Sequence, residues 1–179
     1  MKRLIATAAL VLASSSAFAN TGSIQFRGQI TSATCRVDIV DPVAPGVPTP
    51  VINLGAYDSK YFTATGQRTP ARPFGLWIRD VSTCGLSAGD TVSVTFQGQD
   101  GEDADNYLIK QGTGTATKVA LAITDRKQVA IKPGTPSPTY LVGSSPDLQI
   151  NFNTALVSTD KTVTAGAVAA DVSFLVNIP

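Results

Sequence analysis

The feature that most constrains the fold is a two-residue alternation of apolar and polar side chains, repeated along the chain in short runs. Alternation with period two places every second side chain on one face of a β-strand. The longest run puts these apolar residues on one face: Val168, Ala170, Val172, Phe174, Val176 and Ile178. Shorter runs lie at 74–78, 92–96, 119–123 and 148–152. We find no helical periodicity after residue 19, so the sequence predicts an all-β sandwich.

Glycine and proline separate the runs. The 15 glycines and 11 prolines occur at short intervals, as expected where turns join many short strands. The segment from Asp41 to Pro50 is the richest in proline, and it is expected to be an extended connection rather than the interior of a strand. The acidic segment 100–106 lacks the spacing of an EF-hand and is expected to be a solvated loop.

The first nineteen residues have the three parts of a secretory signal peptide. Lys2 and Arg3 are followed by an apolar run at 4–13 and by Ala17-Phe18-Ala19, an A-x-A cleavage site. The alternative, an N-terminal core helix, fits these parts less well. We therefore expect residues 1–19 to be a signal peptide and the mature chain to begin at Asn20. Export to an oxidising compartment then makes a Cys35–Cys84 disulfide the default expectation.

Composition excludes several classes of function. The net charge is +1, from 14 Lys and Arg against 13 Asp and Glu, and does not indicate nucleic-acid binding. Histidine is absent, which removes His-based triads and His metal sites, and two cysteines cannot form a zinc or iron–sulfur cluster. We expect no metal and no cofactor. Ser158-x-x-Lys161 and Gly112-Thr-Gly114 lack the context of catalytic or nucleotide-binding motifs, so an enzyme is not expected.

The alternation changes parity near residue 34. Apolar residues and glycines occupy even positions from Gly22 to Ile30, whereas Cys35, Val37 and Ile39 occupy odd positions. A strand cannot exchange its faces without a bulge or a break. Two interpretations follow: two separately placed strands, at 20–31 and 34–40, or a single bulged first strand in an ordinary sandwich. Periodicity alone favours the bulged strand.

Several segments, taken in order, resemble the pilins of chaperone–usher fimbriae, of the type 1 family. These are 22–37 with its Ala-x-Cys-x-Val ending, Phe74-x-Leu76-x-Ile78 followed by Cys84, the run 119–126, and 165–176 near the end. The chain departs from the family pattern in two places. Asp80 to Thr83 look like a small insertion before the second cysteine, and Ile178 stands where such chains commonly have a penultimate tyrosine.

The resemblance implies an incomplete immunoglobulin-like sandwich that lacks its last strand and is completed by donor-strand exchange. Residues 20–33 would be the N-terminal donor-strand extension and residues 34–179 the pilin domain. The donor positions would be Gly22, Ile24, Phe26, Gly28 and Ile30. The groove edge gripped by the chaperone would be Val172, Phe174, Val176, Ile178 and Pro179.

The implied function is that of a structural subunit of an extracellular fimbrium on the bacterial surface, supporting cell adhesion and biofilm formation. Its partners would be a periplasmic chaperone, an outer-membrane usher and neighbouring pilin subunits, with no nucleic acid. A minor adaptor or tip subunit is the nearest alternative. A periplasmic binding module with a complete immunoglobulin-like fold is another, and it would pair residues 20–31 within its own chain.

Overall fold

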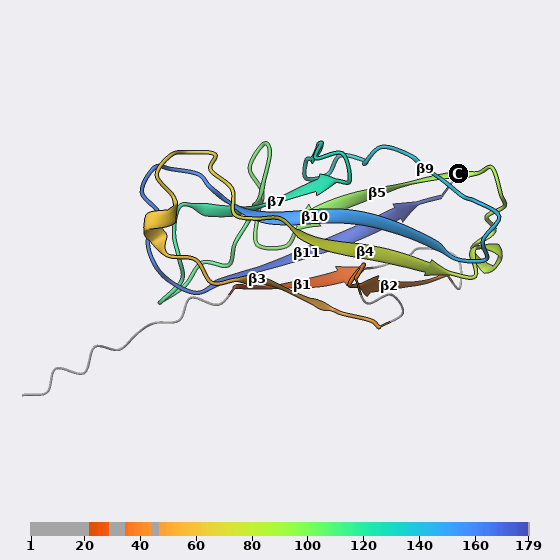
Figure 1. The fold of residues 1–179 in the computed structure, drawn as a ribbon, viewed down its shortest axis with the longest axis horizontal. Coiled ribbons are helices and arrows are strands. Elements are labelled where there is room, and N and C mark those ends of the chain that lie inside the picture. Colours follow the sequence, from red (N-terminus) through yellow and green to blue (C-terminus); the bar gives the residue numbers. More distant parts are fainter. Residues whose placement is uncertain (1–21, 29–34, 44–46, 179) are drawn as a thin grey trace, which may run out of the picture.

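The computed structural model describes residues 22–28, 35–43 and 47–178, with the backbone alone described for residues 22–28 (Figure 1). The expected signal peptide, Ile30 and Pro179 lie outside the described residues. Two β-sheets pack face to face in this part of the chain, and its helical residues belong to two short 3₁₀ turns, η1 (Ser59–Tyr61) and η2 (Val81–Cys84). No described helix has the length and apolar character needed to cross a membrane.

Sheet A has the strand order β3-β1-β11-β5-β9. Its strands are β1 (Gly22–Gly28), β3 (Val51–Gly55), β5 (Thr91–Gly98), β9 (Tyr140–Leu141) and β11 (Val168–Asn177). Sheet B has the order β2-β4-β10-β7-β6, with β8 also paired to β7. Its strands are β2 (Arg36–Val40), β4 (Arg72–Arg79), β6 (Tyr107–Leu108), β7 (Val119–Asp125), β8 (Ala130–Ile131) and β10 (Leu148–Ser158).

The core between the sheets is built from the apolar faces that the alternation predicts. Phe74 of β4 and Phe152 of β10 stack with ring centroids 5.5 Å apart. Phe96 of β5 meets Phe152 edge to face at 5.0 Å and so joins sheet A to sheet B. Edge-to-face and offset aromatic pairs contribute beyond their buried area. The five alternating runs of the sequence all become strands, and the all-β sandwich is confirmed.

The change of parity separates two strands that belong to different sheets. β1 lies in sheet A and β2 in sheet B, on opposite layers of the sandwich. The bulged single strand that periodicity alone favours is therefore wrong. The reason is that the two segments have different partners: β1 pairs with β3 and β11 in sheet A, whereas β2 pairs with β4 in sheet B.

The proline-rich connection and the acidic loop contain more hydrogen bonds than the sequence predicts. In the proline-rich connection, Thr49 N donates to Ile39 O (2.7 Å), and Pro48 bridges Val40. In the acidic loop, Asp103 Oδ1 accepts from the backbone N–H of Asn106 (2.7 Å), and the Asp105 carboxylate pairs with Lys132. The acidic side chains thus organise their own loop as well as meeting solvent.

Candidate functional site: a strand-wide slot in sheet A

The candidate site is the position that β1 occupies between β3 and β11, which we call the slot (Figure 1). β1 pairs with β11 in parallel, from Gly22 opposite Val168 to Gly28 opposite Phe174. It pairs with β3 in the antiparallel direction, with Ile24 opposite Ile52. Within the described part of the chain, β3 belongs to sheet A through β1 alone. Without an inserted strand, sheet A would be interrupted between β3 and β11.

Both walls of the slot carry buried apolar side chains. Ile52 and Leu54 alternate with exposed residues along β3, and their exposed fractions are 7% and 1%. On β11 the buried residues are Val168, Ala170, Val172, Phe174 and Val176. Strand periodicity turns all of these toward the core. A strand in the slot therefore completes both the backbone pairing of sheet A and the cover over its core.

The edge of β11 that faces away from the slot is fixed by the rest of the chain. Residues 172–177 pair with β5. Farther toward its N-terminus, the backbone N–H of Asp171 donates to Asp100 Oδ2 (2.8 Å), and Lys110 N donates to Ala169 O (2.8 Å). The side chains of Lys110 and Asp171 also form an ion pair at 2.8 Å. None of these contacts of β11 involves β1.

Just before β11 begins, beside the first pair of the slot, Gly166 lies against the segment 115–116. Ala116 N donates to Ala167 O (2.9 Å), just before β11 begins. A Cβ atom on Gly166 would overlap the backbone of Thr115 and Ala116, so only glycine permits this approach. A small cavity adjoins this contact and is lined by Gly55, Tyr57, Phe62, Gly166 and Val168, among others. The apolar character of the slot thus continues past the first pair of β1.

At the other end of β11, Ile178 is partly buried and packs against the core. This is the position where the family pattern has tyrosine. Leu175, on the outer face of β11, is 41% exposed. Ile178 therefore keeps an apolar contact with the domain even though the aromatic ring is missing.

The disulfide joins the start of β2 to the end of η2. Cys35 and Cys84 are bonded, with their Cα atoms 4.8 Å apart, and both are buried. Nearby on β2, burial opposes ionisation of Asp38, but hydrogen bonds from Arg79 and Arg36 outweigh it and lower the pKa of that carboxyl. The Arg79 guanidinium also lies over the Trp77 ring, 4.0 Å from its centre.

The structure brings the expected donor positions and the expected groove edge together, but within one chain. Gly22, Ile24, Phe26 and Gly28 lie on β1, in register with Val168 to Phe174. Insertion of these residues into a neighbouring subunit stays a prediction. Sequence reasoning missed the β3 wall, although Ile52 and Leu54 do alternate with Val51 and Asn53. It also missed Asp100, because a single carboxylate that replaces a ladder bond has no sequence signal.

The motifs weighed as catalytic have structural roles. Ser158 ends strand β10, and its buried hydroxyl donates to Ala64 O (2.6 Å), so the Ser158-x-x-Lys161 motif does not lie on a helix. Among the described residues, no cluster of three or more His, Cys, Asp or Glu side chains is placed to hold a metal ion.

Comparison with known proteins gives the family. The family model described as fimbrial protein matches residues 24–178. The long polar fimbria protein A of Salmonella typhimurium is 30% identical over 181 residues, covering 97% of this chain and 95% of its own. The chain therefore belongs to the fimbrial protein family, and its resemblance to chaperone–usher pilins is confirmed.

Solved structures agree with this assignment. An antigen and type I fimbria protein from Burkholderia pseudomallei superposes with a TM-score of 0.53 at 25% identity, covering 89% of this chain and 97% of that protein. A subunit from the structure of a chaperone–usher pilus superposes with a TM-score of 0.57 at 16% identity, covering 96% and 100%. The second likeness concerns the fold alone, and it is the immunoglobulin-like sandwich of pilin subunits.

Proposed function

We propose that this protein is a structural subunit of a surface fimbria, and that subunits join when the N-terminal extension of one enters the slot of the next. The observation that carries the proposal is that β1 alone links β3 to β11 in the described chain. A terminal segment that fills a slot in its own domain can fill the same slot in another copy. Adding an extended strand to a sheet in this way is β-augmentation, of which donor-strand complementation between pilins is a known example.

The energetics favour a long-lived joint. Each large apolar side chain of the donor that becomes buried contributes roughly 1.5–3 kcal/mol. Each backbone ladder bond adds about 1 kcal/mol net. Ile24, Phe26 and Ile30 are the proposed large donor residues, and Gly22 and Gly28 the positions of close backbone approach. Because extension and slot are different surfaces, the contact is head-to-tail and generates a filament rather than a closed ring.

An unfilled slot also explains the proposed partners. Two unpaired strand edges beside exposed core residues promote aggregation. A periplasmic chaperone would cover this surface before assembly, gripping β11 from Val172 to Ile178 and the end of the chain at Pro179. An outer-membrane usher would then pass the subunit to the growing extracellular fimbrium. The proposed route begins with removal of residues 1–19 during export.

Within the fimbria we assign the chain to the bulk of the fibre, where it would support cell adhesion and biofilm formation without catalysis. A subunit in the bulk of a fibre must both give a strand and receive one, and this chain has an extended N-terminal segment at 22–28 as well as a slot. A minor adaptor is the second candidate. A complete periplasmic module would also pair residues 22–28 within its own chain, but membership of the fimbrial family favours the subunit.

A complementation melt tests the proposal. The mature protein lacking residues 20–31, with its disulfide formed, would be heated with and without a synthetic peptide of Asn20 to Thr34. We expect a large stabilisation by the peptide, abolished when Phe26 and Ile30 of the peptide become Asp. A truncated protein that is already stable and does not bind the peptide would show that the domain is complete, and the proposal would fail.

A further inference from the structure

The segment after Cys35 is the weakest part of sheet B against a pull from the N-terminal side. β2 contains five residues, lies at the edge of sheet B and pairs along its length with β4, from Arg36 opposite Arg79 to Val40 opposite Gly75. On its other edge, among the described residues, only Ile39 and Val40, at the far end from Arg36, pair with residues 48–49. Tension on the chain before residue 35 would reach the Arg36 end of this ladder first. At the Arg36 end β2 has one neighbour, so its ladder with β4 can open one bond at a time from that end, and β2 alone would resist poorly.

Tension applied to the chain before residue 35 reaches the disulfide before it reaches β2. Cys35 directly precedes β2, and its partner Cys84 is the last residue of η2, 49 positions along the chain. Both cysteines are buried, with exposed fractions of 8% and 6%. A pull on Cys35 is therefore transmitted through a covalent bond to η2, and the hydrogen bonds between β2 and β4 are bypassed.

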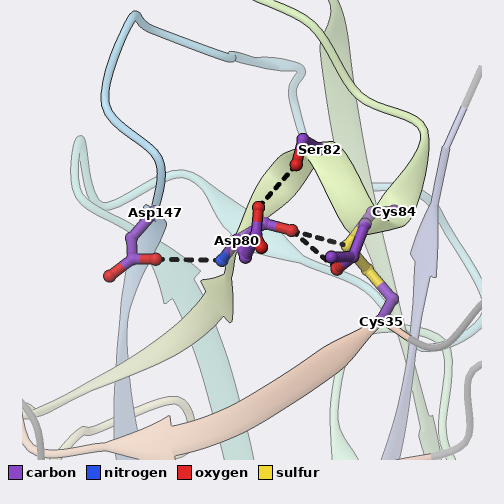
Figure 2. Close-up of a disulfide and its surroundings, with 6 residues drawn as sticks. Cys35, Asp80, Ser82, Cys84 and Asp147 are labelled. Atoms are coloured by element: carbon purple, nitrogen blue, oxygen red, sulfur yellow. Dashed lines mark hydrogen bonds between the residues drawn. A yellow bond between two sulfur atoms is a disulfide. The ribbon is translucent and has the colours of Figure 1, made fainter.

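η2 in turn is tied to the two longest strands of sheet B. Asp80 N donates to Asp147 Oδ1 (2.9 Å; Figure 2). Val81 N donates to Pro146 O (2.8 Å). The two bonds fix η2 to the residues that lead into β10. Asp80 holds a left-handed backbone conformation (φ 47°), and the Ser82 hydroxyl donates to its carboxylate (2.6 Å). Val81 and Leu86 are buried on either side of Cys84.

The strands that receive this tension are paired over a long stretch. β4 ends at Arg79, directly before Asp80 and η2, and β10 begins directly after Asp147. They pair in seven consecutive positions, from Leu148 opposite Ile78 to Thr154 opposite Arg72. Phe74 and Phe152 stack across this pair in the core. Tension applied to β4 and β10 must therefore break a long ladder that is packed against the core, rather than the short ladder of an edge strand.

We propose that the Cys35–Cys84 disulfide and the Asp80–Asp147 contact form a tension anchor, which carries a pull on the N-terminal extension past β2 into β4 and β10. The anchor rests on the proposed function, because only a head-to-tail fibre loads a subunit through its extension. The backbone N–H groups of Asp80 and Val81 then have a mechanical role, because they are the two donors that bind η2 to the segment before β10.

Single-molecule pulling on the mature chain, with handles at Asn20 and after Pro179, tests the anchor without requiring polymerisation or peptide binding. In the unaltered protein we expect extraction of β1 and then one high-force unfolding event. In the C35S/C84S variant we expect an additional low-force event, as β2 and the following connection peel away. Residues 35–50 would then lengthen the chain by at least roughly 50 Å, and more if β3, which has lost its partner β1, follows them. No additional event and an unchanged main force would overturn the proposal.

A second pair of variants keeps the disulfide and so tests the anchor even if C35S/C84S does not fold. Asp147→Ala removes the acceptor for Asp80 N, whereas Asp147→Asn retains an oxygen in the same place. At constant force we expect D147A to unfold about tenfold faster than the unaltered protein and D147N to remain close to it. Equal rates for all three would remove the Asp80–Asp147 contact from the anchor. Failure of the complementation melt would leave these results intact, so the two proposals fail separately.

Discussion

The two edges of β11 are built from different parts of the chain. The edge toward β5 is paired with β5 itself, with the Asp100 carboxylate and with residues 110–116, all inside the domain. The edge toward the slot is paired with residues 22–28, which precede the disulfide-linked domain. One strand therefore has a neighbour from inside the domain on one side and a neighbour from the N-terminal segment on the other. Under the proposed function, the first half of the sheet keeps the fold and the second half is available for exchange.

The largest expected effect comes from truncating two buried phenylalanines, one in sheet B and one on the wall of the slot. Phe152→Ala in sheet B should lower the free energy of unfolding by about 3–5 kcal/mol, with or without residues 20–31. Phe174→Ala, on the slot wall, should approach that cost only when the slot is filled, because an empty slot exposes the ring. Urea unfolding of both variants in both chain lengths measures this. Equal costs for Phe174→Ala in the two lengths would contradict the comparison.

Hydrogen exchange can resolve the two edges residue by residue. In β11 the backbone N–H and C=O groups of Asp171, and of every second residue from it, face β5. The amides of Ala170, Val172 and Phe174 therefore face the slot. Deleting residues 20–31 should speed exchange at these three amides about a hundredfold, equivalent to roughly 3 kcal/mol. The amides of Asp171 and Ser173 should change little. Uniform loss of protection along β11 would mean that both edges depend on β1.

Gly166→Ala tests the close backbone contact just before β11, beside the first pair of the slot. The added methyl group overlaps the backbone of residues 115–116, and such overpacking costs about 1–3 kcal/mol. Gly112→Ala is a matched control in the opposing loop, because its new methyl group would lie 3.9 Å from the nearest atom, Thr115 Cγ2. Thermal melts of both variants should show a loss for G166A alone. Similar losses would indicate a general sensitivity of the loops.

The smallest expected effect lies outside sheet A, at Asp38 on the edge of sheet B. Its pKa is lower when folded than when unfolded, so its carboxylate stabilises the fold above the unfolded pKa near 3.8, and this contribution is lost as pH falls through the folded value. Asp38→Asn should cost about 1 kcal/mol or less at pH 7. The difference in the free energy of unfolding between the unaltered protein and D38N should shrink below pH 4. If urea titrations show the same difference at every pH, the ion pairs of Asp38 are not its cause.

The parts of the molecule predictable from sequence are those set by local patterns. Alternation gives the long strands, and the two cysteines of an exported chain give the disulfide. The parity change marks the passage between layers, although periodicity alone favours the wrong interpretation of it. The β3 wall, the Asp100 cap on β11 and the tight contact at Gly166 depend on residues far apart in the chain. Each is decided by tertiary packing, which a local pattern does not contain.

The opposite directions of β3 and β11 have a consequence for the polarity of any strand between them. β1 runs parallel to β11 and antiparallel to β3. A strand inserted the other way round would simply exchange its parallel and antiparallel neighbours. The two kinds of ladder differ only slightly in stability per residue, so backbone pairing barely favours one direction. The segment from Gly22 to Gly28 has the order glycine, polar, apolar, polar, apolar, polar, glycine, which is the same from either end. The polar and apolar order therefore does not set the polarity, which depends on the different sizes of Ile24 and Phe26 and on residues outside the segment, of which Ile30 is the first large apolar one.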